Sequence, residues 1–286
     1  MQSNPIFSLY EQGCRQFAGI NLEGADLSGA ALIGVDLQGA NLRGANLSRA
    51  FLTKANLTGA NLAYADLSYA KLSEAQLRYT DLTKACLQGI FAIKADLRGA
   101  QLSGSTLTFG NLREAWLVAA NLCGVNLHCT NLRQTDLSRA DLRWANLHAA
   151  RLPAAQLRGA TLQGADLSRV FAREVDLYAL DLSDVNLGDA CLLAANLARA
   201  NLSRANLAGA DLQQANCRGS QWLGANLAQA NFGNADLREA DLQRANLWGA
   251  TFQGALLEQT RLDPKQQQLL QRLEPAAASP LLWMAT

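Results

Sequence analysis

The 286-residue sequence has few of the residues and segments on which enzymes and membrane proteins depend. It contains only 2 His, no Gly-rich phosphate-binding loop, no cluster of carboxylates and no nucleophile beside a base, so acid–base and covalent catalysis have no candidate residues. No stretch approaches the roughly eighteen apolar residues of a membrane-spanning helix. The first residues also lack a basic segment followed by an apolar run. We therefore expect neither an enzyme nor a membrane or secreted protein.

What the sequence does have is an uninterrupted five-residue repeat. Every position ending in 2 or 7 from Phe17 to Leu262 is apolar, and 43 of these 50 sites are Leu. A small residue usually lies two positions earlier and Asn or Asp one position earlier, as in Ala25-Asp26-Leu27. Apolar residues five apart would spiral around an α-helix instead of forming one stripe. On a continuous strand they would point to alternate faces. The chain must therefore turn after each Leu, at a pair of residues whose second member is often Gly.

The residue before each Leu site indicates how many segments form a coil. When these residues are sorted by their place in a twenty-residue cycle, they form four columns. Three columns consist mostly of Asn or Asp, whereas the fourth has Asn or Asp at only 4 of its 12 positions. The fourth column consists of Ala31, Phe51, Lys71, Phe91, Asn111, Asn131, Arg151, Phe171, Cys191, Asp211, Asn231 and Thr251. A four-sided coil predicts unequal sides of this kind. We expect four pentapeptides in each coil.

With this motif the chain resembles the pentapeptide repeat family, whose members form right-handed quadrilateral β-helices. The motif covers about 246 of the 286 residues, and its closely matched units are most similar to bacterial members, in particular cyanobacterial ones. The resemblance implies an all-β solenoid, a right-handed quadrilateral β-helix of about twelve coils of four pentapeptides.

We expect three parts: an N-terminal cap over 1–16, the β-helix over 17–262, and a C-terminal capping helix and tail over 263–286. Asn4-Pro5 predicts a short helix through about Gln12, and Asp263-Pro264 predicts a second helix that stops at Pro275.

Both caps are expected because an uncovered coil would expose Leu side chains and unpaired strand edges. At the C-terminal end the covering residues would be Leu269, Leu270 and Leu273. The tail at 281–284 either folds back or contacts another subunit, which leaves a homodimer through this end open.

Cysteine and histidine predict no metal site. The six cysteines include no pair twenty residues apart and no C-x-x-C, which suits a reducing, cytoplasmic location. Cys217 occupies a Leu site and should simply pack there. His128 and His148 are twenty residues apart, and we interpret them as two exposed side chains in one column in preference to a metal pair. No metal, no cofactor and no catalytic residue is expected.

One face of the expected coil differs in chemistry. Around the column of Leu32, Leu52 and Leu72, outward positions between 51 and 174 carry seven basic and three acidic residues, a balance of +4, while the most negative face reaches only −2. Basic charge mixed with exposed aromatic residues suits recognition of an acidic protein; the alternative is a solvated face that merely tolerates Phe. The candidate protein-binding residues are Phe51, Lys54, Lys71, Phe91, Lys94, Arg113, Arg133, Arg151, Phe171 and Arg173.

Two Leu sites in this column are Ala, and each follows a Phe. Ala92 comes after Phe91, and Ala172 comes after Phe171. A larger residue, Ile or Val, replaces the usual Ala two positions earlier, so we interpret the change as an exchange of core volume. The alternative is a local bulge that turns the Phe inward.

The predicted function is a non-catalytic, rigid protein-binding or regulatory scaffold whose partner has an acidic surface. No small-molecule substrate is expected, and a balance of +4 on one face is too modest for direct nucleic-acid binding. The first alternative comes from the resemblance: some pentapeptide repeat proteins protect DNA gyrase by imitating DNA, which would need a dense acidic stripe. The second alternative is an enzyme of unknown type.

Overall fold

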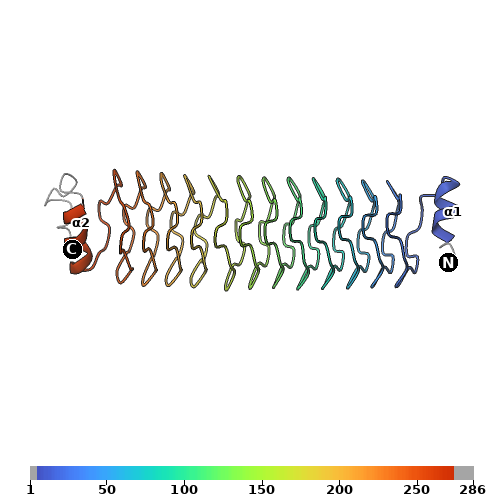
Figure 1. The fold of residues 1–286 in the computed structure, drawn as a ribbon, viewed down its shortest axis with the longest axis horizontal. Coiled ribbons are helices and arrows are strands. Elements are labelled where there is room, and N and C mark those ends of the chain that lie inside the picture. Colours follow the sequence, from blue (N-terminus) through green and yellow to red (C-terminus); the bar gives the residue numbers. More distant parts are fainter. Residues whose placement is uncertain (1–4, 274–286) are drawn as a thin grey trace. The chain divides into compact units, whose positions relative to one another are not determined.

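The computed structural model describes the backbone of residues 5–273 and the side chains of residues 6–268. Its contacts divide the chain into two compact units, Met1–Asn146 and Leu147–Thr286. Helix α1 (Pro5–Glu11) precedes the repeats of the first unit, and helix α2 (Pro264–Leu273) follows those of the second. Figure 1 shows the coils stacked within each unit. Both expected helices are present, and the predicted stop of the second at Pro275 lies outside the described residues.

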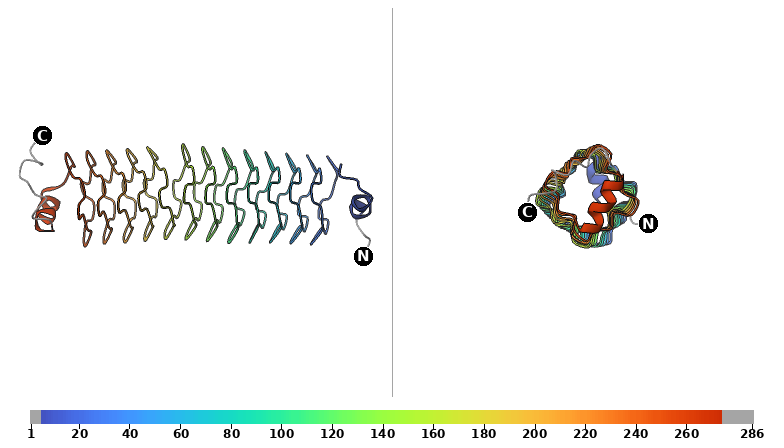
Figure 2. Two further views of the ribbon diagram at one scale, coloured as in Figure 1. Left: turned by 90° about the horizontal axis from the view of Figure 1, so that it is seen from above. Right: turned by 90° about the vertical axis from the view of Figure 1, so that its left-hand side faces the viewer.

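Single-residue parallel bridges, rather than long strands, join successive coils. In the first unit Asn21 pairs with Asn41, and in the second Asp166 pairs with Asn186. The same step of twenty residues recurs through each unit, and the chain turns once in every five residues. Four segments therefore make one coil, whose four-sided outline is seen end-on in Figure 2.

The turn after each Leu site has a left-handed residue. From Leu27 to Ala30 the turn is closed by the Ala30 N–H, which donates to the Leu27 carbonyl at 3.1 Å, and Gly29 has φ 65°. Every position ending in 4 or 9 from Gly19 to Gln259 has a positive φ, and most of these residues are not Gly. Side chains cost free energy in this conformation, so the repeat tolerates a local strain that the surrounding hydrogen bonds hold in place.

The preference for Asn or Asp before each Leu has two causes in the structure. The side-chain oxygen accepts a hydrogen bond from the backbone N–H two residues later, as Asp26 does from Ser28 at 3.1 Å. Asn also donates to the equivalent oxygen of the preceding coil. In the second unit this contact forms a ladder of Asp166, Asn186, Asn206, Asn226 and Asn246, with donor–acceptor distances of 2.9–3.1 Å.

The core of each unit is built from the Leu sites and the small residues two positions before them. All 50 sites are buried except Leu257, which is half-buried near the end of the repeats. Cys217 is fully buried as expected, and its desolvation raises the pKa of the thiol far above its usual value. Where the small residue is Thr, its hydroxyl is satisfied: Thr80 Oγ1 donates to the Leu57 carbonyl at 2.9 Å.

The alternative that Phe91 and Phe171 turn inward is wrong. Their exposed fractions are 39% and 40%, whereas Ala92 and Ala172 are buried. Ile90, at the small-residue position before Phe91, is also buried, which agrees with an exchange of volume between the two inward positions. The backbone keeps its register through both sites.

The described parts of the caps are anchored by specific contacts. At the N-terminal end Ile6 is 1% exposed, and the Tyr10 hydroxyl donates to the Ile33 carbonyl at 3.0 Å. At the C-terminal end Gln266 Nε2 donates to the carbonyls of Leu242 and Ala245, both at 2.8 Å. The covering role predicted for Leu269, Leu270 and Leu273 concerns side chains outside the described residues, as does the tail at 281–284.

Candidate protein-binding surface

In the first unit the predicted face is organised around three residues that follow one another from coil to coil. Phe51 bridges to Lys71, and Lys71 bridges to Phe91. The two Phe side chains are 45% and 39% exposed. The Lys71 ammonium lies 3.3 Å from the centroid of the Phe91 ring, which is the geometry of a cation–π contact. The face therefore presents a cation held over the Phe91 ring, with Phe51 on the preceding coil.

The other cations of this face in the first unit are mostly paired with its own acids. Lys54 lies 3.7 Å from Glu74, and Glu114 is shared by Lys94 at 3.5 Å and Arg113 at 3.1 Å. Arg133 is exposed. Exposed ion pairs contribute roughly 0–1 kcal/mol, so these side chains can exchange partners at little cost. Lys71 differs from them because it contacts a neutral ring, that of Phe91.

The second unit has a similar but smaller set of contacts between a cation and a ring and between a cation and an acid. The Arg151 guanidinium lies 5.9 Å from the centroid of the Phe171 ring, and Arg173 donates to Glu174 at 3.1 Å. Each of these four side chains is exposed. The structure thus gives all ten predicted residues an outward position, seven of them in the first unit and three in the second.

The structure adds a feature that the sequence interpretation missed, a hollow at the edge of this face. Its volume is about 550 Å³, and its lining residues are Gly29, Arg49, Phe51, Tyr69 and Lys71. The hollow exists because Gly29 has no side chain and no heavy atom lies within 4 Å of the point where its Cβ would be.

A second hollow of about 520 Å³ continues across the edge and shares three residues with the first. Its other lining residues are polar: Ser28, Asn46, Ser48 and Ser68. The combined trough is aromatic and cationic on one side and rich in hydroxyl and amide groups on the other.

The sequence interpretation missed Arg49 and Tyr69 because it compared one face at a time. Both residues follow Leu sites of the Leu27 column, although they occupy turns that border the next face. A usable signal was present: sorting the turn residues into the same twenty-residue cycle brings Arg49 and Tyr69 together, each two positions before Phe51 and Lys71.

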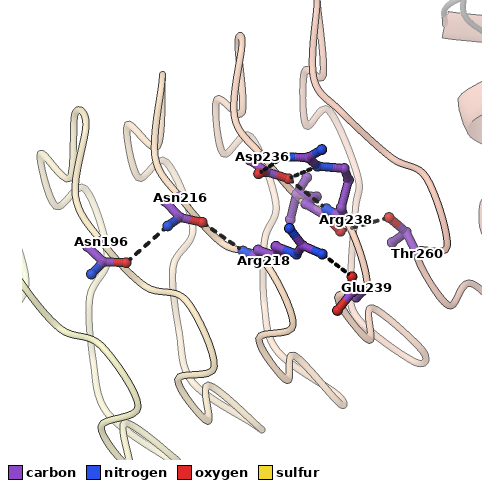
Figure 3. A network of polar contacts seen from close by, with 8 residues as sticks. Asn196, Asn216, Arg218, Asp236, Arg238, Glu239 and Thr260 are labelled. Atoms are coloured by element: carbon purple, nitrogen blue, oxygen red, sulfur yellow. Dashed lines mark hydrogen bonds and ion pairs between the residues drawn. The ribbon is translucent and has the colours of Figure 1, made fainter.

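A polar network in the second unit is the main alternative as a functional site (Figure 3). Arg238 donates to both carboxylate oxygens of Asp236, at 2.9 and 2.7 Å, and Arg218 pairs with Glu239. The hydrogen bond from Arg238 lowers the pKa of Asp236 below its usual value. Every charge drawn there has an opposite partner, so we interpret the network as structural.

The histidines and cysteines of the described residues form no metal centre. His128 and His148 are half-buried rather than exposed. His128 Nε2 lies 3.3 Å from Cys129 Sγ, and His148 Nδ1 lies 2.8 Å from Ser168 Oγ. Within the described residues no group of three His, Cys, Asp or Glu could hold a metal ion. Nor is any helix of that part of the chain long and apolar enough to cross a membrane.

Comparison with known proteins gives a consistent match. The sequence profile of pentapeptide repeats matches repeatedly, over residues 20–59, 55–91, 117–152, 140–178, 155–192, 181–219 and 224–259. A search of curated proteins found no match.

Among solved structures the chain is similar to HetL from the cyanobacterium Nostoc sp. strain PCC 7120, a pentapeptide repeat protein involved in the regulation of heterocyst differentiation. The identity is 34% over 91% of this chain and 96% of HetL, with a TM-score of 0.40. It is also similar to QnrB1, a plasmid-mediated fluoroquinolone resistance protein, at 18% identity over 90% of this chain and 94% of that one, with a TM-score of 0.33. A thylakoid-lumen pentapeptide repeat protein from Arabidopsis thaliana matches at 34% identity over 39% of this chain and 70% of its own, with a TM-score of 0.15.

Proposed function

The chain belongs to the pentapeptide repeat family, and we propose that it acts as a non-catalytic scaffold whose basic, aromatic face binds an acidic surface of another protein. Members of the family form right-handed quadrilateral β-helices, in agreement with the twenty-residue pairing of each unit. The coil number of about twelve, the division into 1–16, 17–262 and 263–286, the cytoplasmic location and the homodimer remain predictions.

The observation that carries this proposal is the outward succession of Phe51, Lys71 and Phe91, in which the two Phe side chains are exposed and Lys71 is half-buried. Their side chains have no acceptor oxygen, so they can make neither the turn contact nor the ladder contact that Asn and Asp make elsewhere. The exposed part of each Phe ring also gains nothing from burial in the free protein. A partner that covers these rings would supply that gain, and Lys71 would meet an acidic group there.

Charge favours this proposal over imitation of DNA. A DNA mimic needs closely spaced negative charges, since duplex DNA carries one per roughly 1.7 Å of its axis. The candidate face instead has a balance of +4, and the whole chain has a net charge of +1. The likeness to the fluoroquinolone resistance protein, at 18% identity, supports a common fold and no more.

A pull-down with purified protein, followed by binding kinetics on the captured partner, tests the proposal. The variant Phe51→Ser/Lys71→Glu/Arg151→Glu should lose the partner. The matched control Arg139→Glu/Arg199→Glu makes the same change in charge at exposed turn positions of another edge and should retain it.

The kinetics separate the two kinds of contact. Reversal of Lys71 and Arg151 should slow association and reduce its dependence on salt, because exposed charges act over roughly 8 to 10 Å near physiological ionic strength. Phe51→Ser should instead speed dissociation, because an aromatic anchor acts through contact area. A captured partner whose affinity is the same for wild type and the Lys71/Arg151 reversal would refute this choice of face.

A further inference from the structure

We propose that the trough at Gly29 is the anchoring site of this surface and that it takes an extended acidic peptide segment carrying an aromatic or large aliphatic side chain between its carboxylates. The inference rests on the proposed function and deepens it, because it names the kind of segment that the partner must present. It concerns the first unit alone.

The chemistry of the lining gives the class of ligand. Two cations, Arg49 and Lys71, border one hollow together with the rings of Phe51 and Tyr69. Within the part of the chain that the structure describes, Arg49 and Lys71 form no ion pair, unlike Lys54 and Lys94 on the same face. A carboxylate is the protein group that pairs with both cations, and an apolar side chain is the group that gains from contact with the two rings.

The shape of the trough favours an extended segment over a single ion. The two hollows share Gly29, Arg49 and Tyr69 and so continue around the edge of the coil. The second hollow adds the hydroxyl groups of Ser28 and Ser48, which can bond to the backbone of an extended peptide. The site holds only two cations, which is few for a nucleic-acid backbone, where binding grows with the number of phosphates contacted.

The side chains that form the wall are held in place. The Tyr69 ring lies against Gly89, since a Cβ added at Gly89 would lie 2.6 Å from two ring atoms. Lys71 is fixed above the Phe91 ring. A site whose side chains are already ordered loses less conformational entropy when a ligand binds.

The turn column also offers a way to fill the trough without disturbing the fold. Gly29 has φ 65°, and Arg49 and Tyr69 adopt 58° and 61° at the next two positions of the same column. A side chain at residue 29 is therefore tolerated. Side chains in these columns lie over the residue twenty positions later, as Tyr69 lies over Gly89 and Tyr79 over Gly99, so Gly29→Gln should extend over Arg49 and occupy the trough.

The matched control is Gly39→Gln. Gly39 has φ 64° and no heavy atom within 4 Å of a built Cβ, and it lies in the turn column of another edge. The two variants bear the same change at equivalent turns, so equal thermal unfolding midpoints would show that any difference in binding is local.

The probes are two fluorescein-labelled peptide pools with randomised flanks, one with the fixed core Glu-Phe-Glu and the other with Gln-Phe-Gln. Fluorescence anisotropy with the full chain should show binding of the acidic pool about tenfold tighter than that of the amide pool, the size expected from two exposed charge contacts. Gly29→Gln and Arg49→Gln/Lys71→Gln should each weaken it at least about fivefold, while Gly39→Gln leaves it unchanged.

Equal binding of the two pools, or equal binding by the two Gly variants, would overturn the inference. Tighter binding of a single-stranded oligonucleotide at the same residues would overturn it in favour of nucleic acid. Self-association of the wild-type chain that Gly29→Gln abolishes would overturn the inference as well, because it would identify a second copy of the chain as the occupant. If the partner from the pull-down is lost on reversal of Lys71 and Arg151 but kept by Gly29→Gln, the trough is not the anchor and the proposed function stands.

Discussion

Replacing a turn Ala by Gly should stabilise this protein at one position and destabilise it at another. Ala179 has φ 55°, in the left-handed region. That conformation costs an L-residue roughly 1–2 kcal/mol, whereas Gly adopts it freely but loses about 0.5–1 kcal/mol more backbone entropy on folding. The difference predicts that Ala179→Gly raises the free energy of unfolding by about 0.5–1 kcal/mol.

The control is the same substitution at Ala208, which is the first residue of its turn pair and is not among the positive-φ residues. Here Gly brings its entropic cost and also removes a half-buried methyl group, so Ala208→Gly should lower the free energy of unfolding by at least about 0.5–1 kcal/mol. Urea unfolding followed by circular dichroism, with both variants at the same protein concentration, measures the sign of each change. Destabilisation by Ala179→Gly equal to that by Ala208→Gly would refute the left-handed turn.

Three further predictions concern the core, a cap and the loss of stability at acid pH. Leu137→Asp buries an unpaired carboxylate at a fully buried site and should unfold or aggregate the protein, whereas the exposed Arg139→Asp should leave its melting temperature nearly unchanged. Gln266→Ala strips two carbonyls of a donor and should cost about 1–3 kcal/mol in urea unfolding; no loss would mean that water replaces the side chain. Because Arg238 lowers the pKa of Asp236, the carboxylate stabilises the fold above its unfolded pKa, near 3.8, and this contribution disappears as pH falls through the folded value. The stability difference between wild type and Asp236→Asn should therefore shrink between pH 7 and pH 2, and a constant difference would exclude this linkage.

The regular features of the fold could be predicted because each follows from a repeated local constraint. The apolar site at every fifth residue fixes the inward face, as the burial of Leu27 and Leu32 illustrates. The Asn and Asp columns give the twenty-residue step, since Asn186 must meet Asp166 to complete its hydrogen bonds. Pro264 after Asp263 marks the start of α2.

Other features depend on contacts between coils that a face-by-face interpretation leaves out. The left-handed conformation of Tyr69 and Arg49 was not foreseen, since Gly is the residue that favours it and the strain is accepted only because the coil on each side holds the turn. The trough arises where a missing side chain, at Gly29, meets long side chains from the following coils. The anchoring by Gln266 was missed because its two carbonyl partners lie 24 and 21 residues away.

Two irregularities meet in the first unit and share Phe51 and Lys71, and together they are the main argument for a binding site there. Phe51, Lys71 and Phe91 forgo the hydrogen bonds of the Asn ladder, each worth about 0.5–1.5 kcal/mol, while further along the same column the ladder resumes: Asn131 donates to Asn111 at 3.1 Å. The interruption adjoins the trough, whose lining includes Phe51 and Lys71. A repeat under selection for stability alone would have no reason to abandon its best residue at successive coils and to leave a hollow beside them. Departures from local rules are expected at functional sites, where a partner supplies contacts that the free protein lacks.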